Sequence, residues 1–375
     1  MTEETLRETP GGEGGAAALR PTSREQAESM RGFVTGHAAP FAIARAGVVG
    51  RAGRGMREYL GALTTLIILV IVLGSTQSGF FAVGNVQNVL ETNAPLFLVS
   101  IGILFTLISA GFDLSVGSMM AVSGWMLVIF INDMQLNSLL AIVLTVLCCG
   151  AIGAVLNGIS IGVLKLNFFV TTLAALILLQ GIVEVASGDV TTPITSTFLS
   201  TLGNGTVGTV PISFLVCVGA LIAGWFVLRK TTFGRAVYSV GGNPEAARLS
   251  GVPVSWTLVG VYGFSGLCSG LAGVVAAGRL SAATPTAGGA IELTSAAAVL
   301  LGGASLAGGV GKLAGMTCGV LVLAVLANGI NLLGLSAYWQ DVVTGAVLLI
   351  AILLDRAHKS GSFKFRGALR WRRSG

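Results

Sequence analysis

The stretch Thr231–Val254, TTFGRAVYSVGGNPEAARLSGVPV, is the one long polar and charged interval in an otherwise membrane-like sequence. Asn243 is expected to cap a short helix, because its side chain can accept hydrogen bonds from the first free backbone amides, and Pro244 suits the first helical position. Gly251 suits the left-handed residue just past the helix end, and a proline two residues later blocks continuation. The sequence therefore predicts one bounded helix over about residues 244–250.

A helix this short is marginal alone in water, because forming its first turn is unfavourable and few residues follow. It therefore needs a surface to pack against. The local residues favour the chain's own membrane domain as that surface, and a groove on another protein is the alternative.

The composition excludes an ordinary soluble domain. Of 375 residues, 53% are hydrophobic and only 10% are charged, against about 25% charged in soluble domains. The 54 glycines are about twice the usual share and suit membrane helices that pack through small residues. The basic residues behind the net charge of +6 lie at the chain ends and in the polar interval, which indicates membrane flanks rather than nucleic-acid binding.

No metal or disulfide site is readable in the sequence. The two histidines, His37 and His358, lie in terminal polar regions. Five cysteines lie inside apolar runs without a metal-binding spacing, which is typical of small buried residues. They are Cys148, Cys149, Cys217, Cys268 and Cys318.

Ten apolar runs are candidate membrane spans, because crossing a bilayer takes about 20 mainly apolar residues. They are 59–75, 94–110, 114–131, 138–164, 168–186, 211–228, 256–278, 291–304, 312–330 and 338–354. The eighth is short and lies between glycine-rich segments, so we expect a broken or half-spanning helix there. The predicted fold class is an all-α integral membrane protein.

Lysine and arginine set the expected orientation, because short cytoplasmic loops collect them. With the N-terminus inside, the inner connections hold Lys165, the four basic residues of 229–248, and Lys312. The outer connections hold no basic residue, and Arg279 at the outer end of the seventh span is the exception. The pattern predicts ten spans with both termini inside, and it places the loop 229–254 in the cytoplasm.

Three regions are expected along the chain. Residues 1–57 have no sustained apolar period and no signal-peptide core, which predicts a disordered cytoplasmic tail. Its patch at 41–49 is the alternative, an amphipathic helix on the membrane surface. Residues 58–355 form the membrane domain, and residues 356–375 form a basic cytoplasmic tail.

Two carboxylates fall near the ends of spans. Ionisable groups at membrane depth are costly unless paired or hydrated, so each invites a functional interpretation. For Asp113 the favoured role is to cap the third span from the membrane interface, where it needs no special partner. For Glu292, capping or pairing with Arg279 is favoured over ligand contact. Both remain candidates for a translocation path.

Neutral polar side chains share helix faces, because residues three or four apart lie on one side of a helix. The pairs are Gln180 and Glu184, Asn328 and Asn331, and Gln340 and Thr344. Amides and hydroxyls suit an aqueous path for a polyhydroxylated solute, although hydrogen bonding between helices is their commoner use. The further path candidates are Asn157, Phe168, Gln180, Asn328 and Asn331.

No catalytic constellation stands out. GGNPEAARLSG and GGASLAGGVGK are rich in glycine, but neither has the GxxxxGK[ST] spacing of a phosphate-binding loop, and no hydroxyl residue follows Lys312. We expect no catalytic residue, no bound cofactor and no ATP hydrolysis in this chain alone.

Five strings together resemble the membrane permease subunit of bacterial ABC importers for ribose and related monosaccharides. They are GFDLSVGSMMAVSG (111–124), NFFVTTLAALILLQGI (167–182), the polar interval 231–254, PTAGGAIELTSAAAVLLGGASLAGGVGK (285–312) and NGINLLGLSAYWQDVVTGAVLLIAILLD (328–355). They follow the family's order, so the resemblance covers about residues 59 to 355.

The resemblance implies a type II-like permease of ten helices in the bacterial cytoplasmic (inner) membrane, surrounded by lipid. It implies three protein partners: a second permease copy or a paralogue, a cytoplasmic tandem ATPase that holds the ATP and magnesium, and an extracytoplasmic sugar-binding protein. In that family GGNPEAARLSG seats in a groove of the ATPase. The matching positions here are Gly241, Gly242, Asn243, Glu245, Ala247, Arg248, Leu249 and Gly251.

Two departures from the family pattern leave questions open. Thr294 stands where relatives often have an acidic residue, which leaves the sugar undefined, and the N-terminal tail is longer than usual. The alternative functions are a permease of the same family for an autoinducer-type sugar, a polyol or a nucleoside, an ion-coupled secondary transporter, and a membrane scaffold without transport.

Overall fold

The computed structural model describes residues 60–336 and 338–359. The expected tail at 1–57, with its patch at 41–49, lies outside the described residues, and so does the C-terminal tail beyond residue 359. The last helix runs to Lys359, so the start of the expected C-terminal tail continues a helix.

Seven of the described helical segments are long and apolar enough to cross a membrane. They are α4 (Val83–Ile108), α5 with the π-helical η1 (Val116–Leu127 and Val128–Asp133), α6 with the π-helical η2 and α7 (Ser138–Ile152, Gly153–Ile159 and Ser160–Gly162), α8 (Phe168–Ser187), α10 (Ile212–Lys230), α13 (Val254–Leu280) and α15 (Leu313–Leu332).

Three further apolar helices are shorter. They are α3 (Leu60–Thr76), α14 (Ile291–Leu301) and the apolar part of α16 (Tyr338–Lys359). The short α14 is the helix expected between the glycine-rich segments. All ten expected runs are therefore helical in the structure, and seven of them reach spanning length.

The second span begins earlier than hydropathy indicates, at Val83 rather than near residue 94. Its first turns carry polar side chains, and several of these bond to other elements of the chain. Gln87 Nε2, for example, donates to the Thr209 carbonyl at 3.0 Å. Hydropathy marks the part of a helix that is apolar, so it misses a polar extension of the same helix.

The connection expected as a plain outer loop at 187–210 contains structure of its own. Ser196 caps α9 (Thr197–Asn204) by accepting the Leu199 amide at 3.1 Å. Four two-residue strands form two antiparallel pairs, β1 (Thr192–Pro193) with β4 (Ala282–Ala283) and β2 (Thr206–Val207) with β3 (Val210–Pro211).

The core is built on α13 and the second half of α4. Helix α13 contacts α4, α5, α6, η2 and α9, and every residue from Leu96 to Ile108 is buried. The rings of Phe105 and Phe264 pack with centroids 4.2 Å apart. Gly266 lies so close to the Cys149 backbone that a Cβ would collide there. Small residues therefore let the central helices approach closely, as membrane helices require.

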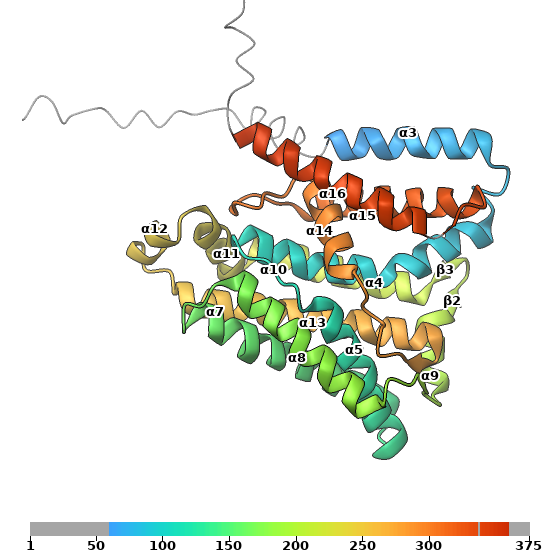
Figure 1. The fold of residues 1–375 in the computed structure, drawn as a ribbon, viewed down its shortest axis with the longest axis horizontal. Coiled ribbons are helices and arrows are strands. Elements are labelled where there is room, and N and C mark those ends of the chain that lie inside the picture. The colour runs from blue at the N-terminus through green and yellow to red at the C-terminus, as the bar shows by residue number, and fades with distance from the viewer. Residues whose placement is uncertain (1–59, 337, 360–375) are drawn as a thin grey trace, which may run out of the picture. The chain divides into compact units, whose positions relative to one another are not determined.

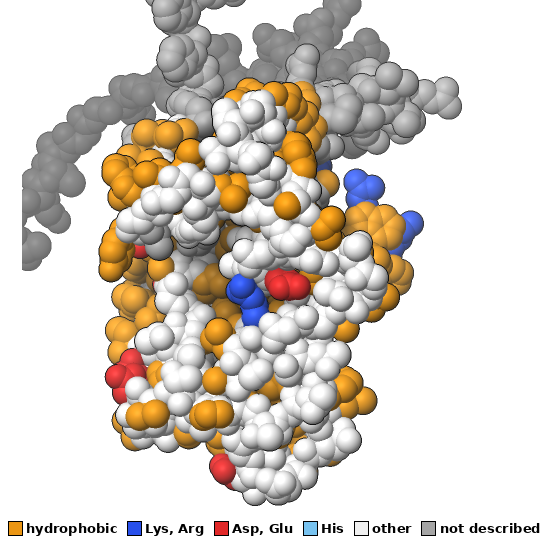
Figure 2. Space-filling model, turned by 90° about the vertical axis from the view of Figure 1, so that its right-hand side faces the viewer, with side chains coloured by type: hydrophobic (Ala, Val, Ile, Leu, Met, Phe, Trp, Pro, Cys, Tyr) orange, Lys and Arg blue, Asp and Glu red, His pale blue; other side chains and the backbone are white. Residues whose placement is uncertain are grey.

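The two ends of the described bundle differ in charge. Figure 1 shows α11 and α12 at one end of the bundle and α9 with the β2 and β3 strands at the other. Viewed from the α9 end, Figure 2 shows mostly backbone and side chains that are neither charged nor hydrophobic, with a few basic and acidic side chains near the centre and hydrophobic ones most numerous toward the edge. The segment α10–α12 carries Arg229, Lys230, Arg235 and Arg248.

Candidate functional site

The polar interval folds as two consecutive helices, α11 (Thr232–Gly242) and α12 (Pro244–Leu249). Asn243 separates them, and its Oδ1 accepts the amides of Glu245 at 3.0 Å and Ala246 at 2.9 Å. Gly251 has a left-handed φ of 81°. The predicted helix with its cap and terminating glycine is therefore confirmed, and it ends one residue earlier than expected.

Helix α11 was not predicted from the sequence. Thr231 caps it by accepting the Gly234 amide at 3.1 Å. Its buried side is formed by Gly234, Val237, Val240 and Gly241, which lie at helical spacing. Two of these four are glycines, so only Val237 and Val240 mark this side as apolar in the sequence.

An exposed ion pair lies on α12. Arg248 Nη2 and Nε donate to Glu245 Oε1 and Oε2 at 2.6 and 3.1 Å, and the side chains are 66% and 65% exposed. The hydrogen bonds and the charge of Arg248 hold the pKa of Glu245 below its usual value. Such an exposed pair contributes little to stability, so it is available to a partner.

A large apolar side chain stands beside this pair. Leu249 is 75% exposed, whereas Ala247 of the same helix is buried. Helix α12 contacts α11 and α13. One face of α12 is thus anchored to the chain, and the other presents an apolar group and two charges to the surroundings.

Gly241 and Gly242 at the end of α11 have opposite surroundings. A Cβ on Gly241 would overlap the Ile108 carbonyl at the end of α4, whereas Gly242 has open space around it. Gly241 therefore seats α11 directly on the membrane core.

Asp113 is buried among four hydrogen bonds. Its Oδ1 accepts the Ser115 amide at 3.0 Å, the Ser115 hydroxyl at 2.6 Å and Asn157 Nδ2 at 3.3 Å. Its Oδ2 accepts the Ser265 hydroxyl at 2.7 Å. The bond to the Ser115 amide was expected, but Asp113 is not the N-cap of α5, because that position is occupied by Ser115. The expectation of an interfacial carboxylate without special partners is wrong, because Asn157 lies on η2 and Ser265 on α13.

Glu292 and Arg279 do not form the ion pair that was one of the two roles expected for Glu292. Arg279 Nη2 donates instead to Thr92 Oγ1 at 2.7 Å and to Asn88 Oδ1 at 3.5 Å, both on α4. Glu292 lies half-buried in the first turn of α14, close to Gly117 of α5.

Gln180 lies on the α8 face that it was expected to share with Glu184. Its Nε2 donates to Glu184 Oε1 at 2.8 Å and to the Pro285 carbonyl at 3.1 Å. Phe168 is half-buried at the start of the same helix. The structure thus places Gln180 beside the segment that precedes α14.

Asn328 and Asn331 both bond to other helices. Asn328 exchanges hydrogen bonds with Asn85 of α4, and Asn331 Oδ1 accepts Gln340 Nε2 of α16 at 3.2 Å. These two side chains therefore form hydrogen bonds between helices, which was the alternative to a role in the translocation path.

The path candidates do not converge on one place. Asp113 and Asn157 share a buried cluster, Gln180 and Glu292 flank the segment 284–290 from α8 and α14, and the two asparagines of α15 bond to α4 and α16.

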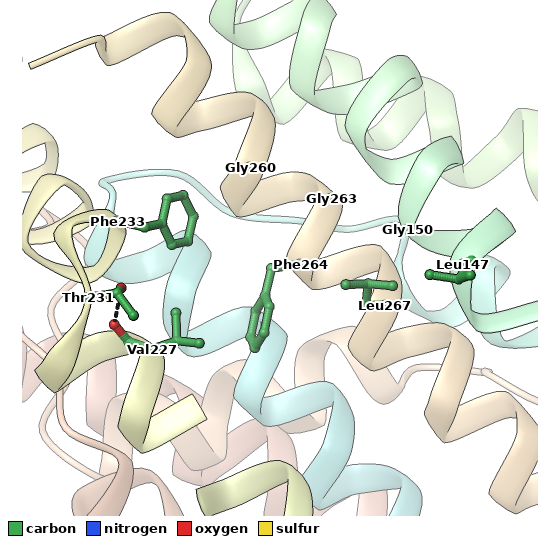
Figure 3. Close-up of a pocket in the computed structure, with 9 residues that line it drawn as sticks. All are labelled: Leu147, Gly150, Val227, Thr231, Phe233, Gly260, Gly263, Phe264 and Leu267. Carbon is green, nitrogen blue, oxygen red and sulfur yellow. Dashed lines mark hydrogen bonds between the residues drawn. The ribbon is translucent and has the colours of Figure 1, made fainter. Parts of the chain in front are cut away.

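An apolar pocket of about 480 Å³ opens between α6, α10, α11 and α13 (Figure 3). Phe233 and Phe264 point into it beside Gly260. Thr231 is the one polar side chain in its lining, and its hydroxyl donates to the Val227 carbonyl at 2.6 Å. A sugar would find almost no hydrogen-bonding partner here, and no predicted path residue lines this pocket.

A second hollow of similar size lies at the α9 end and was not predicted. Its lining is rich in hydroxyls and includes one amide: Thr195, Ser196, Thr197, Ser200, Thr201, Asn204 and Ser281. The clustered Ser and Thr residues of 195–201 were its only signal in the sequence.

Comparison with known proteins identifies the family. Residues 85–352 match the family described as the permease component of the branched-chain amino acid transport system. The matched range includes the α11–α12 segment and all seven helices of spanning length except the first two residues of α4.

Curated relatives cover most of the chain. The ribose import permease protein RbsC of Bacillus subtilis is 38% identical over 304 residues, which are 80% of this chain and 94% of that protein. RbsC of Escherichia coli K12 is 35% identical over 299 residues, 78% of this chain and 92% of that protein. The xylose transport system permease protein XylH of the same strain is 31% identical, covering 79% of this chain and 91% of its own.

No solved structure matches the chain. The family match and the seven spanning-length helices make it a multi-pass membrane protein. The chain belongs to the family of transport-system permease components described above.

Proposed function

We propose that this chain is the permease subunit of an ATP-driven importer that carries a ribose-like monosaccharide from a binding protein into the cytoplasm. The observation that carries the proposal is α12, a capped and exposed helix that presents Leu249 and the pair Glu245–Arg248. The names of the ribose and xylose permeases support the solute class.

In this proposal the membrane domain has ten spans of a type II-like permease and both termini in the cytoplasm. The three shorter apolar helices complete the seven long ones. The basic residues of α10–α12 favour the cytoplasm for that end of the bundle, since such residues collect there. The mostly uncharged surface of the opposite end, which carries few basic side chains, suits the outside (Figure 2).

The ATPase is a separate protein that holds the ATP and magnesium. A groove on the ATPase receives α12. When the ATPase closes and opens, it displaces α11 and α12. Transport requires that the ATPase contact the permease differently in its two states. The proposed coupling residues are Gly241, Gly242, Asn243, Glu245, Ala247, Arg248, Leu249 and Gly251.

The proposed path runs along α8, enclosed by a second permease copy or a paralogue. Helix α8 exposes large apolar side chains, among them Val185 at 87%, yet the same helix carries Gln180 and Glu184. A carboxylate that faces lipid is costly, so a second copy that encloses water along this face is favoured. Asp113, Asn157, Phe168 and Glu292 are the other path candidates, whereas Asn328 and Asn331 bond to neighbouring helices and are left out of the proposed path. The binding protein docks at the α9 end.

Uptake by proteoliposomes tests the proposal. The chain is reconstituted with its ATPase and binding protein, and entry of labelled D-ribose and D-xylose is measured with and without ATP. We expect uptake that needs ATP and persists when ionophores collapse the membrane potential. Uptake without the ATPase that collapses with the potential would show a secondary transporter. Binding of the loaded binding protein without any uptake would show a scaffold.

A further inference from the structure

The connection between α4 and α5 is strained where α4 ends. Ala110 has a left-handed φ of 62°, a conformation that only glycine adopts without cost. The Gly111 amide donates to the Thr106 carbonyl at 2.9 Å, which closes the helix end in the manner of a Schellman motif. A left-handed alanine persists only where its surroundings hold it.

Asp113 holds this connection from inside the bundle. Through Ser115 it fixes the start of α5, through Asn157 it reaches η2, and through Ser265 it reaches α13. Asn157 Nδ2 also donates to the Ser115 hydroxyl at 2.8 Å. Ser265 is 152 residues from Asp113 in sequence, so the cluster joins three distant parts of the chain.

The end of α11 meets the same connection from the other side. The Ile108 carbonyl accepts the Gly309 amide at 2.8 Å, and Gly241 lies against that carbonyl. Gly308 lies between Ala110 and the Gly241 carbonyl, with no room for a Cβ. Three backbones therefore touch at one glycine junction, formed by Gly241, Ile108–Ala110 and Gly308–Gly309.

We propose that Asp113 is a positioning residue for transport. Its four hydrogen bonds form a lock that holds the connection 109–115 in place, so that movement of α11 and α12 passes through the glycine junction to η2 and α13. The inference rests on the proposed function, in which α12 receives the motion of the ATPase. Without the lock, the connection pivots at Ala110 and absorbs the displacement before it reaches α5 and η2, so that only the direct contacts of α11 and α12 with α13 transmit it.

Hydrogen exchange of the full-length permease in lipid nanodiscs tests the lock without any partner. Ser265→Ala removes the bond to Asp113 Oδ2. Ser269→Ala is the matched control, because Ser269 is buried one turn away and donates only to the Ser265 carbonyl of its own helix. We expect about tenfold faster exchange in Ser265→Ala for peptides covering 109–116 and 305–312, and no change in Ser269→Ala. Unchanged exchange in these two peptides would overturn the lock.

Transport per ATP tests the consequence, using the reconstituted system described above. Asp113→Ala is expected to keep ATP hydrolysis but import about tenfold less sugar per ATP. Asp113→Asn is expected to recover at least about half of the wild-type ratio, because its Oδ1 still accepts the bonds from Ser115 and Asn157. If Asp113→Asn imports as little sugar per ATP as Asp113→Ala, the negative charge itself is needed. That result would overturn positioning by hydrogen bonds.

Two further results would need separate interpretation: failure of Asp113→Ala to assemble, and absence of sugar uptake by the wild-type protein. If Asp113→Ala does not assemble, Ser265→Ala replaces it, with about threefold less sugar per ATP expected than for Ser269→Ala; equal ratios overturn the proposal. Wild-type protein that moves no sugar would refute the proposed function instead, and hydrogen exchange would still decide the lock.

Discussion

Asn85 and Asn328 exchange two hydrogen bonds that tie the start of α4 to α15. Asn85 Nδ2 donates to Asn328 Oδ1 at 3.1 Å, and Asn328 Nδ2 donates to Asn85 Oδ1 at 2.8 Å. Asn85 Nδ2 also donates to the Phe80 carbonyl at 2.8 Å. Each amide thus satisfies the other within the bundle, and neither needs a solute.

This pair should contribute to stability and not to solute affinity. In a double-mutant cycle of Asn85→Ala and Asn328→Ala, we expect a coupling energy of about 0.6 to 1.7 kcal/mol, measured as thermal unfolding in detergent. The sugar concentration for half-maximal uptake should stay unchanged in Asn328→Ala. A raised half-maximal concentration with unchanged unfolding would return Asn328 to the translocation path.

The adjacent glycines of α11 offer a matched pair of variants. Gly241→Ala places a methyl group onto the Ile108 carbonyl, whereas Gly242→Ala meets no atom within 4 Å. Overpacking costs about 1 to 3 kcal/mol, so we expect a lower unfolding temperature for Gly241→Ala. Gly242→Ala should be neutral or stabilising by up to about 1 kcal/mol, because alanine favours the helix. Equal unfolding temperatures would contradict the close seating of α11.

The sequence predicted those features that depend on neighbouring residues. Asn243, Pro244 and Gly251 determine the bounds of α12 locally, and each lies where it was expected. Long apolar runs likewise placed the helices. Helix α11 was missed because two of its four buried residues are glycines, whose close contacts become visible only once the partner backbone is known.

Features that depend on distant residues were only partly readable. The bond from Asp113 to the Ser115 amide is local and was expected, but Asn157 and Ser265 approach it only through the fold. The expected pairing of Arg279 with Glu292 failed because the polar extension of α4 brings Thr92 to Arg279. Hydropathy gave no sign of that extension.

Charge-reversal variants of Glu245 and Arg248 distinguish two roles of this pair: contact with the ATPase, and stabilisation of the shape of α12 itself. Glu245→Arg and Arg248→Glu should each leave unfolding unchanged, because an exposed pair contributes little to stability, yet each should abolish ATP-dependent uptake. The double exchange restores a pair of opposite charges three residues apart, although in the order that the helix dipole disfavours. Contact with the ATPase predicts that the double variant stays inactive. Recovered uptake in that variant would show that the pair only shapes the helix.

Leu249 should supply apolar affinity for the ATPase. It is 75% exposed, so Leu249→Ser should change stability by less than about 0.5 kcal/mol. A side chain that enters a partner's pocket can carry much of the binding energy, so we expect affinity for the purified ATPase to fall about tenfold or more. Leu280→Ser is the control, because Leu280 is 58% exposed at the end of α13.

Salt separates the apolar contribution of Leu249 from the charged contribution of Glu245 and Arg248, since high ionic strength weakens charge contacts and leaves the apolar one. If α12 docks through Leu249, the loss in Leu249→Ser should persist at high salt. Equal affinity for both leucine variants and wild type would exclude Leu249 from the interface.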